Sequence, residues 1–292
     1  MDQAEQLRNI IKKQNQKRHI ARVITVTSGK GGVGKSSIAI NLAIQMRKLG
    51  KRVMILDADF GLANVEIMLG IRPKYSLADV LYQGKEIKDI ITSGPMDIGF
   101  ISGGSGIREL VNLTREQLSV LVQKLYDLDE MADIIVIDTG AGISDSVLEF
   151  VAVSSEVLLV ATPEPTSLTD AYALLKTLHQ KEEFLPDNTK IKLIANRTFS
   201  EKDGRDLYSK LNVVAERFLN FELEYIGHIP NDQNISRACI QQKPILMVYP
   251  NSPASLALEQ LAIQLSDTNA VVLQNKKGIS QMFASLLHFR RR

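Results

Sequence analysis

The chain of 292 residues has little of several features, and each shortage excludes a class of protein. It contains one cysteine, Cys239, so one subunit cannot form a disulfide or a multi-thiolate zinc or iron–sulfur site. Its N-terminus lacks the apolar core of a signal peptide, and no apolar run approaches the ~20 residues that a spanning helix needs. We therefore expect a protein of the reducing cytoplasm, with peripheral membrane attachment still open.

The sequence also lacks an excess of charge of one sign. Thirty-five lysines and arginines stand against 33 acidic residues, which leaves a net charge of +2. This balance does not attract nucleic acid to the whole surface, although a local basic patch could still do so. With 45% hydrophobic and 23% charged residues, the composition is that of a globular protein long enough to bury a large core.

Short apolar segments alternate with longer amphipathic ones from residue 22 onward. The apolar segments have the length of strands buried on both faces, and they are 22–28, 52–57, 97–101, 133–138, 156–161, 190–195 and 224–229. Helical spacing predicts helices near 36–49, 114–129, 166–180, 203–219 and 253–267. This alternation predicts an α/β fold with a doubly wound, mostly parallel sheet flanked by helices. We divide the chain into an N-terminal segment (1–19), a main domain (20–270), and a polar linker with a C-terminal helix (271–292).

A glycine-rich sequence follows the first predicted strand and precedes a predicted helix. It satisfies the pattern G-x-x-x-x-G-K-[ST] with Gly29, Lys30, Gly31, Gly32, Val33, Gly34, Lys35 and Ser36. Backbone N–H groups of such a loop surround phosphate oxygens, and Lys35 reaches the β- and γ-phosphates. Ser36, followed by Ser37, offers its hydroxyl to Mg²⁺. The motif predicts a phosphate-binding loop for a nucleoside triphosphate, and a glycine-rich turn with an exposed lysine is the alternative.

The second lysine of the loop, Lys30, is not required in a generic phosphate-binding loop. With it, the sequence resembles the deviant Walker A family of P-loop ATPases, of the MinD and ParA type, over about residues 20–270. The resemblance implies a homodimer that encloses two ATP molecules, in which this signature lysine reaches the partner's phosphates and neutralises charge there. An exposed loop lysine without that role is the alternative.

Carboxylates stand at the ends of two predicted strands, Asp57 and Asp59 after one and Asp138 at the other. The carboxyl ends of strands line the ligand crevice of an open α/β sheet. The family resemblance implies that Asp59 orients or activates the attacking water, and that Asp57 and Asp138 act around Mg²⁺, mainly through its waters. Asp59, Lys30 and Lys35 are thus the expected catalytic residues. Each aspartate could instead cap the following helix.

Two later strands end in polar turns, Asn196-Arg197-Thr198 and Pro230-Asn231-Asp232. In the resembling family, an asparagine at the first position contacts the adenine, and the backbone after the second strand closes the base pocket. The resemblance therefore implies that Asn196, Pro230, Asn231 and Asp232 surround the base. The chain lacks the N-K-x-D motif of guanine-binding proteins, which favours ATP over GTP. A simple strand-ending turn is the alternative for Asn196.

Two longer strings, DADFGLANVEIMLG at 57–70 and IDTGAGISDSVL at 137–148, are similar to those of one branch of the family, the FlhG (YlxH or FleN) group of flagellar-placement ATPases. MinD itself usually has a proline where this chain has Gly140. The resemblance to this branch also extends to the N-terminal and C-terminal segments of the chain. It implies that a short motif stimulates a FlhF-type GTPase, and we expect a helix-in-groove contact, through Asp2, Gln3, Ala4, Glu5, Gln6, Leu7 and Arg8. A disordered charged tail is the alternative.

The C-terminal end of the chain has an amphipathic pattern. One apolar stripe follows the spacing i, i+3, i+4, i+7, i+8 with Ile279, Met282, Phe283, Leu286 and Leu287. Lys276 and Lys277 precede the stripe, and three arginines at 290–292 follow it. Such a helix is typical of attachment to an anionic membrane surface, and a helix docked on its own domain is the alternative. Both can hold if the helix docks in one nucleotide state and is released in the other.

Together these features predict a Mg²⁺-dependent ATPase that hydrolyses ATP to ADP and phosphate as a homodimer. We expect it to cycle on and off the inner face of the bacterial cell membrane and to regulate flagellum number or placement. The expected partners are the FlhF-type GTPase, flagellar C-ring or switch components and an anionic membrane surface, and not DNA. Two other functions stay open: a ParA-like partition ATPase that binds DNA non-specifically, and a metabolic P-loop enzyme that uses ATP on a small molecule.

Overall fold

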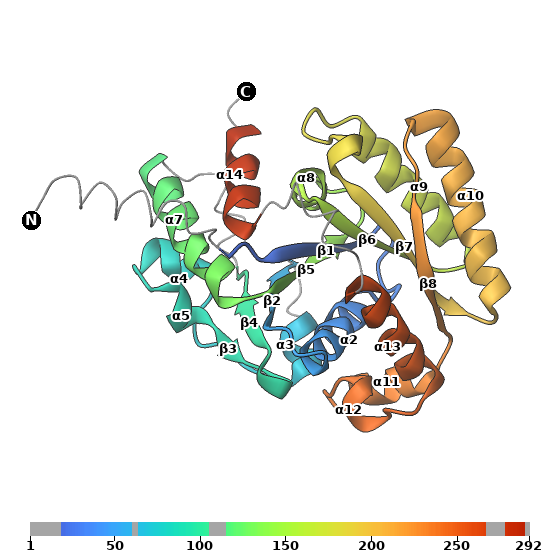
Figure 1. The fold of residues 1–292 in the computed structure, drawn as a ribbon, viewed down its shortest axis with the longest axis horizontal. Coiled ribbons are helices and arrows are strands. Elements are labelled where there is room, and N and C mark those ends of the chain that lie inside the picture. Colours follow the sequence, from blue (N-terminus) through green and yellow to red (C-terminus); the bar gives the residue numbers. More distant parts are fainter. Residues whose placement is uncertain (1–18, 60–63, 105–114, 267–277, 290–292) are drawn as a thin grey trace, which may run out of the picture.

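An eight-stranded sheet forms the centre of the protein (Figure 1). The computed structural model describes residues 19–59, 64–104, 115–266 and 278–289. The strand order is β3-β4-β2-β5-β1-β6-β7-β8, and all neighbours are parallel except β3 and β4. The strands are β1 (Arg22–Ser28), β2 (Val53–Ala58), β3 (Thr92–Ser93), β4 (Gly99–Ser102), β5 (Ile134–Ala141), β6 (Glu156–Ala161), β7 (Lys190–Thr198) and β8 (Glu224–Pro230). The predicted doubly wound α/β fold is confirmed.

Helices cover both faces of this sheet (Figure 1). One face carries α2 (Lys35–Lys48), α3 (Asn64–Leu69), α11 (Gln233–Ile240), α12 (Ile245–Val248) and α13 (Pro253–Ser266). The other carries α4 (Leu77–Tyr82), α5 (Ile87–Ile90), α7 (Arg115–Met131), α8 (Asp145–Val153), α9 (Pro165–His179), α10 (Glu201–Leu219) and α14 (Ile279–Phe289). Within the described ranges, no helix is both long and apolar enough to span a lipid bilayer.

The strands bury both of their faces, which explains their continuous apolar sequence. In β1, Ile24 and Val26 pack under the helices of one face, while Val23 packs under those of the other. The helices between the parallel strands return the chain, so that the carboxyl ends of β1, β2, β5, β6, β7 and β8 lie at one edge of the sheet. This edge is where an open α/β sheet binds its ligand.

The seven predicted strands and five predicted helices are all present, with bounds shifted by a few residues. The strand predicted at 97–101 begins at Gly99, because Pro95–Asp97 forms a short 3₁₀ turn. The prediction missed the two-residue antiparallel β3 and several short helices, of which α8 matters most for the site. Short elements such as these carry too few residues for a hydrophobic period to stand out.

A buried ion cluster joins three neighbouring strands at the opposite, amino edge of the sheet. Glu156 accepts two hydrogen bonds of 2.7 Å from the Arg22 guanidinium, and Lys192 Nζ lies 3.1 Å from the same carboxylate. Burial alone would raise the pKa of Glu156, but these two cations outweigh it and hold the pKa below its ordinary value of 4.5. The carboxylate therefore stabilises the fold in its charged form.

We expect Glu156→Gln to destabilise the protein by about 3 kcal/mol at pH 7, because it leaves Arg22 without this counter-charge and leaves the fully buried Lys192 with only the exposed Glu224 carboxylate, 3.9 Å away. The pKa of Glu156 is lower in the folded protein than in the unfolded chain, so its charged form stabilises the fold at pH values above the unfolded-state pKa. This stabilisation is lost as the pH falls below 4.5. Urea denaturation should therefore show that the difference in the free energy of unfolding between parent and variant is smaller in acid than at pH 7. An equal difference at pH 7 and pH 3.5 would contradict this assignment.

Candidate nucleotide-binding site

The glycine-rich loop connects β1 to α2 at the carboxyl edge of the sheet, as predicted. Gly32 and Gly34 have φ values of 76° and 96°, in the left-handed region that favours glycine. A Cβ at Gly29 would overlap the backbone of Asp170 in α9, so the loop lies directly against that helix. A Cβ at Gly31 or Gly32 would meet no described atom within 4 Å, which leaves the outer side of the loop open for phosphate oxygens.

Lys35 begins α2 and points into the site. Its side chain is 8% exposed, and its Nζ lies 3.2 Å from Oδ1 of Asp138, a carboxylate with no exposed surface. Burial raises the pKa of Asp138, and the ammonium of Lys35 opposes this rise. Asp138 and Asp57 are register partners on β5 and β2, so the sheet itself sets the two carboxylates side by side.

Asp57 and Asp59 form the end of β2 and the turn that follows it. The backbone N–H of Asp59 donates a 3.0 Å hydrogen bond to Oδ1 of Asp57. Burial is the main cause that raises the pKa of Asp57 to about 7. Nδ2 of Asn64 lies 3.4 Å from Oδ2 of Asp59, and a Cβ at Gly140 would lie 3.5 Å from its Oδ1. The turn after β2 and the carboxyl end of β5 therefore meet at Asp59.

These groups fit a Mg²⁺ ion that a nucleotide brings with it. Oδ2 of Asp138 is buried, and no described group reaches it with acceptable hydrogen-bond geometry. Within the described ranges, no group of three or more His, Cys, Asp or Glu residues could hold a metal ion by itself. Mg²⁺ commonly uses one or two carboxylates with water and phosphate oxygens, and the Ser36 hydroxyl with Asp57 and Asp138 supplies that kind of donor set.

The signature lysine, Lys30, is held at the mouth of the loop. Its Nζ donates hydrogen bonds of 2.7 Å to Oε2 of Glu164 and to Oγ1 of Thr166, both at the start of α9. The ammonium lowers the pKa of Glu164. The sequence reasoning missed Glu164 and Thr166, although their place after the strand β6 follows the same rule that identified Asp57 and Asp138. The Lys30 side chain is 33% exposed, so it faces the surface of this subunit.

Asn196 and Arg197, at the end of β7, hold the glycine-rich loop through hydrogen bonds to its carbonyls. Nδ2 of Asn196 donates to the Val33 carbonyl at 2.7 Å, and the Arg197 guanidinium donates to the Gly32 carbonyl at 2.7 Å. Arg197 has a φ of 55°, and its N–H bonds to Oδ1 of Asn196 at 2.9 Å. Both side chains hold loop carbonyls, which orients the loop amides away from them. A direct base contact by Asn196 remains a prediction.

The turn after β8 lies beside the end of β7, where the N–H of Asn231 donates to the Thr198 carbonyl at 2.9 Å. Asp232 caps two helices, since its carboxylate accepts from the N–H of Asn234 in α11 and of Ala254 in α13. Burial raises the pKa of Asp232, but these hydrogen bonds outweigh it and the net shift is downward. The structure thus gives Asp232 the capping role, while closure of a base pocket by 230–232 remains a prediction.

The C-terminal helix α14 is docked on the protein itself. Ile279, Met282, Phe283 and Leu286 are buried in a core shared with α7 and α8, and Figure 1 shows α14 beside them. The rings of Phe283 and Phe150 meet edge to face at 5.7 Å. The side chain of Leu287 lies outside the described residues, as do residues 2–8 of the proposed partner motif and the flanking basic residues.

Comparisons with known proteins agree with this geometry. The sequence matches the ParA family, described as NUBPL iron-transfer P-loop NTPase, over residues 19–266. It is 43% identical to the antiactivator FleN of Pseudomonas aeruginosa over 244 residues, which are 84% of this chain and 86% of that protein. It is 33% identical to the flagellum site-determining protein YlxH of Helicobacter pylori, over 99% of both chains.

Solved structures show the same fold. The MinD cell division protein of Aquifex aeolicus is 26% identical, with a TM-score of 0.66 over 85% of this chain and 98% of that one. The septum site-determining protein MinD of Pyrococcus horikoshii, complexed with Mg-ADP, has a TM-score of 0.66 over 87% of this chain and all of the other. At 22% identity, the second likeness concerns the fold alone.

Proposed function

This chain belongs to the ParA/MinD family of P-loop ATPases, in its FlhG/FleN branch, and we propose that it regulates flagellum number or placement through an ATP-dependent dimer at the membrane. Its likeness to FleN and YlxH supports the flagellar role. The observation that carries the membrane cycle is the contact between α14 and α8. That contact connects the predicted membrane helix to the helix that follows β5, whose carboxyl end lies at the nucleotide site.

ATP hydrolysis needs a positioned water and neutralised phosphate charge. Lys35 lies within the loop, where its ammonium meets the β- and γ-phosphates, and nucleotide binding would replace its contact with Asp138. A Mg²⁺ ion held by Ser36, Asp57 and Asp138 neutralises charge on the phosphates when it is bound. Asp59 orients the attacking water and accepts its proton, since it stands where the turn after β2 meets the carboxyl end of β5.

The dimer would complete the site. Lys30 faces the surface of its own subunit, where Glu164 and Thr166 hold it, so a second subunit placed across this edge is within reach of its side chain. There the ammonium would stabilise the partner's transferred phosphate, as an arginine finger does in other P-loop enzymes. Loss of phosphate would remove this attraction and return the protein to monomers.

Nucleotide state would control α14 through α8. Gly140 lies at the carboxyl end of β5 beside Asp59, and the loop after β5 leads within a few residues into α8, whose Phe150 touches Phe283. A rearrangement of this loop around a γ-phosphate would move the surface on which α14 docks. The released helix would place Phe283 and its apolar neighbours in a lipid surface, and two such helices on one dimer would bind far better than one.

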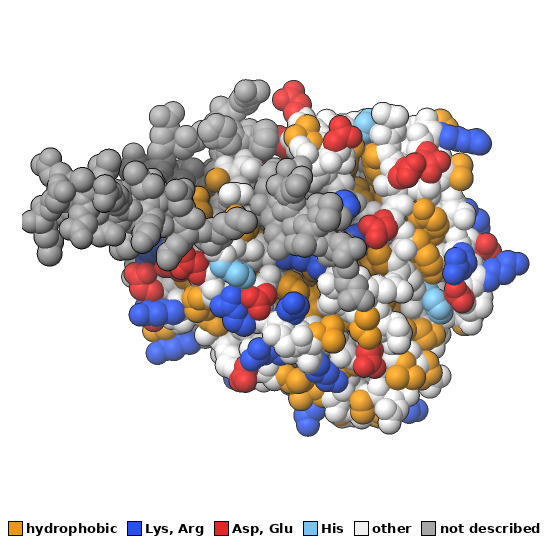
Figure 2. All heavy atoms as spheres, viewed as in Figure 1, with side chains coloured by type: hydrophobic (Ala, Val, Ile, Leu, Met, Phe, Trp, Pro, Cys, Tyr) orange, Lys and Arg blue, Asp and Glu red, His pale blue; other side chains and the backbone are white. Residues whose placement is uncertain are grey.

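The remaining partners follow from the family resemblance. Residues 2–8 would stimulate a FlhF-type GTPase, flagellar C-ring or switch components would be further partners, and the inner face of the bacterial membrane would be the lipid surface. A DNA-partition role has less support, because Lys and Arg alternate with Asp and Glu on the face drawn in Figure 2 rather than forming a uniformly basic surface. Salt-sensitive binding to DNA would favour that role instead.

The membrane cycle is tested by freeing α14 without changing its apolar face. Asp129 in α7 accepts hydrogen bonds from the N–H groups of Ile279 and Ser280 and from the Ser280 hydroxyl. Asp129→Ala removes this cap, which is worth about 1–3 kcal/mol, and shifts the helix toward its undocked state. We expect sedimentation with anionic vesicles in ADP to increase about tenfold.

The matched control is Asp127→Ala, which removes an exposed aspartate of the same helix and should bind vesicles like the parent. Adding Phe283→Glu to Asp129→Ala should abolish the gain, because it places a charge on the apolar face. If the double variant still sediments like Asp129→Ala, then α14 is not the membrane contact and this part of the proposal is wrong.

A further inference from the structure

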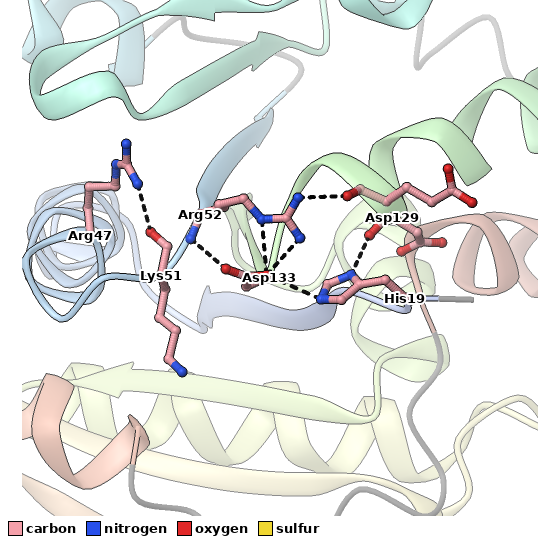
Figure 3. Close-up of polar contacts among 7 residues, drawn as sticks. His19, Arg47, Lys51, Arg52, Asp129 and Asp133 are labelled. Carbon is pink, nitrogen blue, oxygen red and sulfur yellow. Dashed lines mark hydrogen bonds and ion pairs between the residues drawn. The ribbon is translucent and has the colours of Figure 1, made fainter. Parts of the chain in front are cut away.

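The first described residue, His19, is bound to the end of the helix that holds α14. Its Nδ1 lies 3.0 Å from the carbonyl oxygen of Asp129, and its Nε2 lies 3.2 Å from Oδ1 of Asp133 (Figure 3). Both ring nitrogens face oxygen acceptors, so the protonated ring can donate to both. The connection between the N-terminal segment and β1 is therefore fastened to the last turn of α7.

Asp129 binds residues near both ends of the chain, His19 and the first turn of α14. Its carbonyl meets His19, while its carboxylate, in a residue that is 3% exposed, holds the first turn of α14. A Cβ at Gly278 would lie 2.5 Å from the carboxylate oxygens, so this approach requires glycine at that position. A negative carboxylate at the N-terminus of α14 also suits the helix dipole. Any shift in the last turn of α7 therefore displaces the Asp129 carboxylate that binds the start of α14.

Neighbouring residues keep this last turn in place. Arg52 donates to the Glu130 carbonyl at 2.9 Å, and its backbone and guanidinium both donate to Asp133 (Figure 3). Hydrogen bonds from Arg52 are the main cause that lowers the pKa of Asp133, so the group facing His19 is a carboxylate. Carbonyls at a helix C-terminus lack partners within the helix, and here His19 and Arg52 supply the donors.

A second contact joins the same stretch of chain to the other end of the C-terminal linker. Arg22 donates a 2.6 Å hydrogen bond to the carbonyl of Leu265, in the last turn of α13. Arg22 thus contacts α13, which precedes residues 267–277. His19 contacts Asp129, and Asp129 in turn holds the start of α14, which follows those residues.

We propose that binding of a protein partner to the N-terminal segment and docking of α14 are coupled through His19. A partner that takes hold of residues 1–18 draws His19 from the end of α7, which loosens the last turn that carries the Asp129 carboxylate and releases α14. The coupling deepens the proposed function, on which it rests, because it makes GTPase binding and membrane binding favour each other. By linkage, release of α14 must strengthen partner binding by the same factor.

Hydrogen–deuterium exchange on the full chain in ADP tests this coupling. His19→Ala should speed exchange of the α14 amides about two- to fivefold, the loss expected for one partly exposed hydrogen-bonded side chain. Saturation with the cognate FlhF-type GTPase, bound to a non-hydrolysable GTP analogue, should produce the same increase in the parent and little more in His19→Ala. His179→Ala, at an exposed histidine at the end of α9, is the matched control and should behave like the parent.

The affinity for the GTPase gives the reciprocal measurement. Asp129→Ala, which frees α14, should bind the GTPase two- to fivefold more tightly than the parent, whereas Asp127→Ala should not. Unchanged α14 exchange in His19→Ala overturns the coupling, and so does GTPase binding that leaves α14 exchange of the parent unchanged. If the GTPase does not bind, the partner assigned under the proposed function is wrong, and the coupling is then decided by the exchange of His19→Ala alone.

Discussion

Lys30→Ala is expected to retain ADP binding while losing ATP-dependent dimerisation and reducing ATP hydrolysis at least ~100-fold. We propose that the loop glycines and Lys35 form the phosphate cradle within one subunit and that Lys30 is not part of it, because Glu164 and Thr166 hold its side chain. Removal of Lys30 therefore spares the cradle and removes only the charge offered to a second subunit. Calorimetry with ADP, light scattering with a non-hydrolysable ATP analogue and phosphate release give the three readings.

The control for this variant is Lys51→Ala, which removes an exposed lysine at the opposite end of α2. It should match the parent in all three readings. If Lys30→Ala weakens ADP and ATP binding equally, the lysine acts on the nucleotide of its own subunit, and the proposed action across a dimer is wrong.

Asp59→Ala gives the second large effect, a loss of hydrolysis with ATP still bound. The carboxylate lies where the turn after β2 meets the carboxyl end of β5, beside Gly140 and next to Asp57. Its removal leaves Lys35, Ser36 and Asp138 in place, so nucleotide binding should persist. We expect hydrolysis to fall ~100-fold or more, the usual contribution of a positioned base, and the ATP dimer to accumulate.

Asp97→Ala is the control, because Asp97 is an exposed aspartate near the amino edge of the sheet whose loss should not alter turnover. Single-turnover kinetics would separate the chemical step from product release. Parental turnover by Asp59→Ala would show that another group orients the water, and Asp57 and Asp138 would then be the next to test.

The phosphate loop and its carboxylates could be predicted because their chemistry requires particular residues at particular places. A loop of Gly29 to Ser36 between a strand and a helix has few other uses, and aspartates at the ends of β2 and β5 must meet once the strands are parallel neighbours. The fold was predictable for a similar reason, since strands buried on both faces have a continuous apolar sequence.

The partners of these residues were harder to predict, because they depend on packing between distant segments. Nothing in the sequence around Lys30 indicates its partner Glu164, which is 134 residues away. The sequence alone also did not identify Arg197 as a hydrogen-bond donor to the Gly32 carbonyl of the loop. The apolar stripe of α14 predicted a helix, but the same stripe suits a lipid surface or a groove between α7 and α8. The short β3 and α8 had too few residues to show a pattern.

We propose that ATP joins two chains into one particle and that ADP separates them. Size-exclusion chromatography with light scattering, on the parent protein, measures this directly. We expect the mass of one chain in ADP with Mg²⁺ and the mass of two chains in a non-hydrolysable ATP analogue with Mg²⁺. The same mass in both nucleotides, whether of one chain or of two, would contradict it.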